Sequence, residues 1–212
     1  MDEHFPQIIR RWLGNQRNAN NESIDNATKE AADISGACQA ASDAAKGTEP
    51  VNRKERTRYN TSVRYLEENA LQLWAEKKGL WINEHDFMSQ YAARQIGAGA
   101  EQKVYLHENA REVIKVNTET YHGNWLELFN RLLCQAILFP TTKYSTIGFT
   151  STEQTFAVVL QQQFAMLTEG APRSIVESYL NRHGFNRTKN DDYYNATLGI
   201  ILEDLHDENV FI

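Results

Sequence analysis

Residues 91–117 constrain the fold most, because three strand-like runs follow one another there with only short breaks between them. The stretch reads YAARQIGAGAEQKVYLHENAREVIKVN. Valine, isoleucine and tyrosine mark the runs, glycines lie in the first break, and residues 108–110 form the second. Breaks this short are typical of turns that join neighbouring strands. The sequence therefore predicts strand, glycine turn, strand, short turn and strand in this order.

Helical and strand patterns flank this region. Before it, apolar residues recur at helical spacing, at Val63, Leu66, Ala70, Leu73 and Trp74. After it, residues 124–140 predict a helix with an apolar face of Trp125, Phe129, Leu132, Leu133 and Ala136. Residues 144–164 then predict a strand pair that turns at residues 151–153.

The last part of the chain predicts one more helix and one more strand. Pro172 opens the helix, whose inward side is expected to hold Ile175, Val176, Tyr179 and Leu180. The run LGIILED predicts a buried strand or the approach to one. Because the strands cluster ahead of the last helices and do not alternate with them, the expected fold class is α+β.

These patterns divide the chain into four expected segments. They are an N-terminal helix with a polar, alanine-rich linker (1–59), a helical lead-in (60–90), a strand-rich domain (91–165) and a turn-rich end (166–212). A net charge of −6 argues against electrostatic binding of nucleic acid by the molecule as a whole. No apolar run approaches the ~18 residues of a membrane span, and the two cysteines match no zinc spacing. We therefore expect a cytoplasmic protein without nucleic-acid or membrane partners.

Two candidate functional features lie in the strand-rich domain. Gly97 and Gly99 occupy a strand-to-strand turn, where backbone N–H groups can approach an anion closely; the alternative is that they form only a turn. Lys115 lies inside an apolar strand, and period-two alternation places it on the same face as Val113. A buried ammonium needs an acid or a bound phosphate as partner. The alternative for Lys115 is an edge strand from which the side chain reaches solvent.

A third candidate feature lies near the end of the sequence. Asp204 and Asn209 are five positions apart, with His206 between them. A turn of this length can aim a carboxylate and an amide oxygen at one point. The aspartate could then accept a proton from a hydroxyl, and the asparagine oxygen could hold Mg²⁺.

The order of these features resembles that of protein-kinase-like phosphotransferases, from about residue 90 to the end. The shared order is a glycine turn between two strands, a lysine in the next strand, a helix with an acid, two more strands and Asp-x-x-x-x-Asn. The run DLHDEN is similar to the Asp-Leu-His-x-x-Asn loop of aminoglycoside-kinase-like and atypical bacterial kinases. The stretches AVVLQQQF and YYNATLGIILEDLHDENVF further resemble the kinase-like domains of polyvalent proteins from bacterial mobile elements.

The resemblance implies ATP and Mg²⁺ as cofactors and gives the strand-rich residues the following roles. Gly97 and Gly99 would cover the nucleotide phosphates, and Val104 would touch the adenine or the ribose. Lys115 would bind the α- and β-phosphates and pair with an acid on the following helix, for which Glu127 is the best candidate. We therefore expect these two side chains within about 4 Å of each other.

The resemblance also implies a hinge, a base and a metal ligand. The backbone of residues 162–165, with Gln163 in its middle, would read the adenine. Asp204 would be the catalytic base and Asn209 a metal ligand. Gln102 replaces the third glycine of the kinase loop, which suggests a stiffer loop. The implied fold is the smaller kinase lobe, an antiparallel sheet plus a helix, with only the start of the larger helical lobe, after a helical and low-complexity N-terminal extension.

The family pattern has a second metal-binding aspartate downstream of the asparagine, whereas only VFI follows Asn209 here. We therefore expect a truncated, pseudokinase-like domain with at most weak nucleotide binding and without competent phosphoryl transfer; whether it is an enzyme stays open. An exposed apolar patch on the partial larger lobe is expected to be covered in one of two ways: by the amino-terminal segment that holds Phe5, Ile8 and Trp12, or by a second copy in a homodimer, which is slightly favoured. The alternative is a non-enzymatic interaction protein of a bacterial mobile element, in which Lys115 and Glu127 form a structural ion pair.

Overall fold

The computed structural model divides the chain into two compact units, residues 20–164 and residues 1–19 with 165–212. The residues that it describes are 33, 34, 36, 38, 53–99, 102–118, 124–139, 142–164, 170–189, 191–203, 205 and 210. Among these, no helix is both long enough and apolar enough to cross a membrane.

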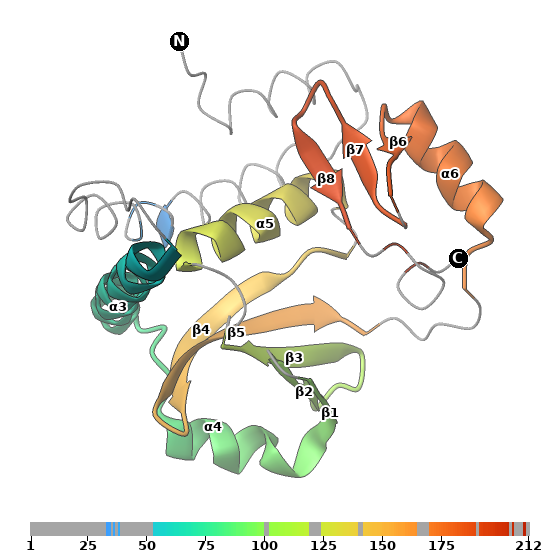
Figure 1. The fold of residues 1–212 in the computed structure, drawn as a ribbon. Helices are drawn as coiled ribbons and strands as arrows, with labels where there is room; N and C mark the ends of the chain where they lie inside the picture. Colours follow the sequence, from blue (N-terminus) through green and yellow to red (C-terminus); the bar gives the residue numbers. More distant parts are fainter. Residues whose placement is uncertain are drawn as a thin grey trace. The chain divides into compact units, whose positions relative to one another are not determined.

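A five-stranded sheet forms the centre of the first unit (Figure 1). Its strands are β1 (Gln95–Ala98), β2 (Gln102–Leu106), β3 (Glu112–Asn117), β4 (Ser145–Thr152) and β5 (Thr155–Gln163). Their order is β1-β2-β3-β5-β4, and every neighbouring pair is antiparallel. The sheet confirms the three-strand run and the later strand pair that the sequence predicts.

The helices of this unit whose bounds lie within the described residues are α3 (Arg53–Lys78), α4 (Glu84–Tyr91) and α5 (Trp125–Leu138). The strand expected from residue 91 is wrong in its first part, because Tyr91 ends α4 and a short 3₁₀ helix covers Ala92–Arg94. Asn83 starts α4 by accepting a hydrogen bond from the backbone N–H of His85. Such a cap satisfies an N–H that the first helical turn leaves without an intrahelical partner.

The buried face of α3 differs from the predicted one by about one position. Leu73, expected inside, is 68% exposed. The residues that face the core recur every four positions, at Val63, Glu67, Leu71 and Ala75. This spacing keeps them on one side of the helix. The most buried polar member of the face is Glu67, at 0% exposure.

The face of the sheet turned to α4 carries one hydrophobic cluster. Its members are Phe87, Tyr91, Tyr105, Ile114, Val116, Ala157 and Val159. Aromatic rings join the helix to the sheet, since the Phe87 and Tyr105 ring centroids lie 5.4 Å apart in an edge-to-face arrangement. Figure 1 shows α4 along this side of the strands. The lead-in to the predicted domain is therefore part of its core.

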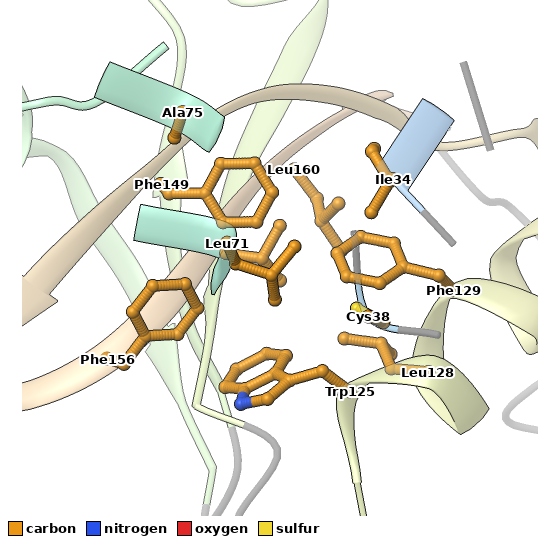
Figure 2. Close-up of a cluster of buried hydrophobic side chains, with 11 residues drawn as sticks. Ile34, Cys38, Leu71, Ala75, Trp125, Leu128, Phe129, Phe149, Phe156 and Leu160 are labelled. Atoms are coloured by element: carbon orange, nitrogen blue, oxygen red, sulfur yellow. The ribbon is translucent and has the colours of Figure 1, made fainter. Parts of the chain in front are cut away.

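The opposite face of the sheet packs against α3 and α5. Figure 2 shows Leu71 and Trp125 from these helices close to Phe149 and Phe156 from the sheet. The Trp125 and Phe156 ring centroids lie 5.0 Å apart, and those of Phe149 and Phe156 lie 5.8 Å apart. The predicted apolar face of α5 is confirmed except for Leu132, which is only partly buried. Helices thus cover both faces of the sheet.

The connection between α3 and α4 docks beside β4. Phe149 donates its N–H to the Leu80 carbonyl at 2.9 Å, and Ile82 donates its N–H to the Phe149 carbonyl at 2.7 Å. Together these bonds make an isolated parallel bridge between Trp81 and Phe149. Gly148 permits the close approach, because a Cβ there would lie 2.7 Å from Ile82 Cδ1 and 2.8 Å from the Leu80 carbonyl oxygen.

The second unit contains one α-helix and a small antiparallel sheet among its described residues. The helix is α6 (Arg173–Arg182), and the strands are β6 (Asn186–Arg187), β7 (Tyr193–Asn195) and β8 (Ile200–Leu202), in the order β6-β7-β8. The strand predicted in LGIILED is β8. The inward face predicted for α6 is wrong in part: Leu180 is buried, but Ile175 is 50% exposed and Tyr179 46%.

Candidate functional site

Lys115 lies in the middle of β3, between β2 and β5, and its side chain is half-buried. It pairs with Val104 on one side and with Leu160 on the other, so the three side chains share one face of the sheet. Leu160 belongs to the hydrophobic cluster between the sheet and the helices α3 and α5, here called the cluster under α5. Lys115 therefore lies on the face of the sheet that packs against these two helices. Ile114 belongs to the cluster on the opposite face, as strand alternation predicts. The edge-strand alternative for Lys115 is therefore wrong.

The Lys115 ammonium contacts a tyrosine and not the predicted glutamate. Lys115 Nζ donates a hydrogen bond of 2.9 Å to Tyr144 Oη, and it lies 4.9 Å from the centroid of the same ring. The predicted ion pair with Glu127 is wrong, because Glu127 lies in the first turn of α5 with an exposed side chain. Within the part of the chain that the structure describes, Lys115 forms no ion pair with a carboxylate.

The glycine turn lies next to the same face of the sheet. Gly97 in β1 pairs with Val104, which in turn pairs with Lys115. Gly99 donates its N–H to the Gln102 carbonyl at 2.8 Å, so this group holds the turn. The nearest atoms to a Cβ at either glycine would be 3.8 Å away, an ordinary contact. Neither packing nor a left-handed backbone requires glycine at these two positions.

Apolar side chains line the neighbourhood of Lys115 on this face. Val104 is half-buried and Val113, two residues before the lysine, is buried. At the end of β5, Gln163 is exposed, and the next residue, Phe164, donates its N–H to the Arg111 carbonyl at 2.8 Å. The predicted adenine contacts of Val104 and Gln163 stay predictions.

The predicted base and metal ligand cannot be placed beside Lys115. Asp204, His206 and Asn209 lie outside the described residues. Within the described ranges, no group of three or more histidine, cysteine, aspartate or glutamate side chains has an arrangement that could hold a metal ion. The roles of Asp204 and Asn209 stay predictions from the resemblance.

Sequence reasoning missed the residue that holds the start of α5. The buried Glu67 carboxylate on α3 accepts the Trp125 backbone N–H at 2.8 Å, and Asn124 accepts the Glu127 N–H at 2.9 Å. Arg64 adds a contact, with its guanidinium carbon 5.1 Å from the centroid of the Trp125 ring. The sequence held a signal for this role. Glu67 lies four positions after Val63 and four before Leu71, so i, i+4 spacing places its carboxylate on the same helix face as these apolar residues.

The architecture places the first unit in a recognisable class. Five antiparallel strands, a helix between the third and fourth of them and a lysine in the third strand define the smaller lobe of a kinase-like fold. A family model described as "Serine/Threonine/Tyrosine Kinase found in polyvalent proteins" matches residues 65–212, more than half of the chain. The chain belongs to this family of kinase-like domains. No curated protein and no solved structure gives a significant match.

Proposed function

We propose that this kinase-like domain binds a nucleoside triphosphate on the face of β1, β2 and β3 that carries Lys115. The nucleotide, ATP in the simplest case, would supply a phosphate chain for the ammonium and a base for the apolar side chains of Val104 and Val113. Gly97 and Gly99 would leave room for the phosphates beside the turn. The described residues fit this ligand, since they combine a cation, an apolar surface and two glycines whose missing side chains leave space beside the sheet.

One observation carries the proposal. Lys115 is a half-buried cation in the interior of a sheet, and its described partner is a neutral phenol. Removing an ammonium from water is unfavourable unless an anion or several hydrogen bonds offset the loss. A phosphate would supply the negative charge that the described residues do not provide to Lys115, on the face where the glycine turn lies.

The same contact supports binding without efficient phosphoryl transfer. In protein kinases, the ion pair between the β3 lysine and the helix glutamate must be in place for activity. Lys115 contacts Tyr144 instead, while Glu127 is exposed. We therefore propose a domain in which nucleotide binding is weak and transfer inefficient, with Asp204 as base and Asn209 as Mg²⁺ ligand if transfer occurs. The contact between Lys115 and Tyr144 also favours a second candidate function. In this alternative the chain is a non-enzymatic interaction protein, and Lys115 only stabilises the fold.

Calorimetric titration with ATP, with and without Mg²⁺, tests the proposal. Lys115→Met should weaken ATP binding by about tenfold or more, because it removes a charged contact to phosphate. The matched control is Lys103→Met, since Lys103 is a lysine of the same sheet on the opposite face, where it pairs with Val116. Adenosine binding should be the same in both variants.

Three results separate the two candidates. Loss of ATP affinity in Lys115→Met alone supports nucleotide binding. An equal effect in Lys103→Met, or no ATP binding by the unmodified protein, favours the interaction protein. A phosphoryl-transfer assay with ATP and a generic protein acceptor then tests the second part, and rapid transfer would contradict it.

A further inference from the structure

We propose that Tyr144 is the positioning residue for Lys115, taking the place that an acid on α5 was expected to fill. This inference rests on the proposed nucleotide binding. Its basis is the pair of contacts that one side chain makes to the ammonium: a hydrogen bond of 2.9 Å through the hydroxyl and a distance of 4.9 Å to the ring centroid. Tyr144 thereby fixes both the distance and the direction of the lysine head.

The segment that carries Tyr144 is itself held from two sides. The Thr142 carbonyl accepts a hydrogen bond from Gln162 Nε2 of β5 at 2.7 Å and from Gln135 Nε2 of α5 at 3.2 Å. Thr142 also donates its N–H to the Phe139 carbonyl at 3.1 Å. These bonds anchor the chain two residues before Tyr144. The Tyr144 side chain is partly buried against the cluster under α5, so its ring has a fixed support.

The chemistry of a phenol differs from that of a carboxylate at this position. An ammonium has three N–H donors, and the phenol oxygen accepts one of them, which leaves two for a ligand. A carboxylate would neutralise the ammonium, whereas the neutral phenol leaves its charge for an anion. The ammonium lies at the hydroxyl end of the ring, with its nitrogen 4.9 Å from the ring centroid. Tyr144 therefore orients Lys115 without reducing the charge that attracts a phosphate.

Two substitutions at Tyr144 separate the hydroxyl from the ring. Tyr144→Phe keeps the ring and removes the acceptor, and Tyr144→Leu removes both. We expect ATP affinity to fall about three- to tenfold in Tyr144→Phe, the range for losing one ordinary intramolecular hydrogen bond, and to fall further in Tyr144→Leu. Adenosine affinity should stay unchanged, because the contact concerns the phosphate side. Tyr65→Phe is the matched control, since Tyr65 is 65% exposed on α3.

A double-mutant cycle provides the readout that a merely structural role would not move. In a Lys115→Met background, Tyr144→Phe should have no further effect on ATP affinity, because the lysine that it positions is gone. Circular dichroism melting of each variant identifies a loss of folding, and a variant that melts before the assay temperature is replaced by Tyr144→Trp, which keeps an aromatic face without the phenol.

The outcomes distinguish this inference from the proposed function. If the unmodified protein binds no ATP, the proposed function fails and the inference with it. If ATP binds and Lys115→Met weakens binding, but Tyr144→Phe binds ATP as well as the unmodified protein or better, only the positioning role is overturned. Tighter binding in Tyr144→Phe would show that the phenol competes with the phosphate for the ammonium.

Discussion

Gly148→Ala is expected to destabilise the first unit strongly, although it adds only one methyl group. The added Cβ would lie 2.7 Å from Ile82 Cδ1 and 2.8 Å from the Leu80 carbonyl oxygen, both closer than real Cβ contacts allow. The isoleucine can rotate, but the carbonyl is backbone and accepts the Phe149 N–H at 2.9 Å. The segment 80–82 must therefore move away from β4.

The magnitude follows from two contributions. Overpacking a closely packed site costs about 1–3 kcal/mol, and weakening the Phe149 hydrogen bonds adds about 1 kcal/mol. We expect the free energy of unfolding to fall by about 2–4 kcal/mol, a large part of the ~5–15 kcal/mol that holds a typical domain. Urea unfolding followed by circular dichroism measures this loss. Amide hydrogen exchange at Ile82 and Phe149 should accelerate most, because those N–H groups form the bridge.

Gly97→Ala is the matched control for this experiment. It is the same substitution in the same sheet, but the nearest atom to the new Cβ lies 3.8 Å away. The unfolding free energy should change by less than about 0.5 kcal/mol or rise slightly, since alanine restricts the unfolded chain. Equal losses in the two variants, or a loss below about 1 kcal/mol in Gly148→Ala, would refute the reasoning from close contact.

Three further outcomes are expected. Glu67→Ala should lower the free energy of unfolding by about 1–3 kcal/mol in thermal denaturation, because the buried Trp125 N–H loses its acceptor; Glu67→Gln keeps an acceptor oxygen and should cost less. Phe87→Ala should cost about 3–5 kcal/mol by urea unfolding, whereas Met88→Ala, at a 43% exposed side chain, should cost less than about 0.5 kcal/mol. Burial raises the pKa of the Cys134 thiol from 9.0 to about 11. Between these two pH values the thiol stays neutral in the folded protein and ionises in the unfolded chain. Its contribution to stability is present below pH 9.0 and is lost as the pH rises toward about 11. Cys134→Ala should flatten this part of the stability curve, and an unchanged curve would contradict the burial argument.

Local patterns in the sequence predicted most of the first unit. Alternation and turn residues located β2 and β3, and a 3.6-residue period located α5. These elements depend on short-range rules that a single segment contains. The prediction failed at residues 91–94, where the pairing of Phe87 with Tyr91 one helical turn later extends a helix. An aromatic residue before a strand was read as part of that strand.

The candidate site shows a different limit. Period-two alternation placed Lys115 on the correct face, because strand geometry fixes the side of every residue. Its partner Tyr144 is 29 positions away in the chain and became a neighbour only through the packing of β4 and β5. The resemblance to kinases suggested a helix acid, and no local pattern indicated a phenol. Tertiary contacts of this kind are absent from a single sequence.

The bridge at Trp81 has a consequence for how this sheet behaves in concentrated solution. The outermost strands are β1 and β4, and an open strand edge can pair with a strand of another molecule. Leu80 and Ile82 form hydrogen bonds with the N–H and C=O groups of Phe149 in β4, so these groups are not available to another strand. The other edge strand, β1, is only four residues long and has an irregular register. The segment between α3 and α4 thus shields the longer edge at Phe149, near the middle of β4. Variants that release this segment should form intermolecular β-structure well before their helices unfold.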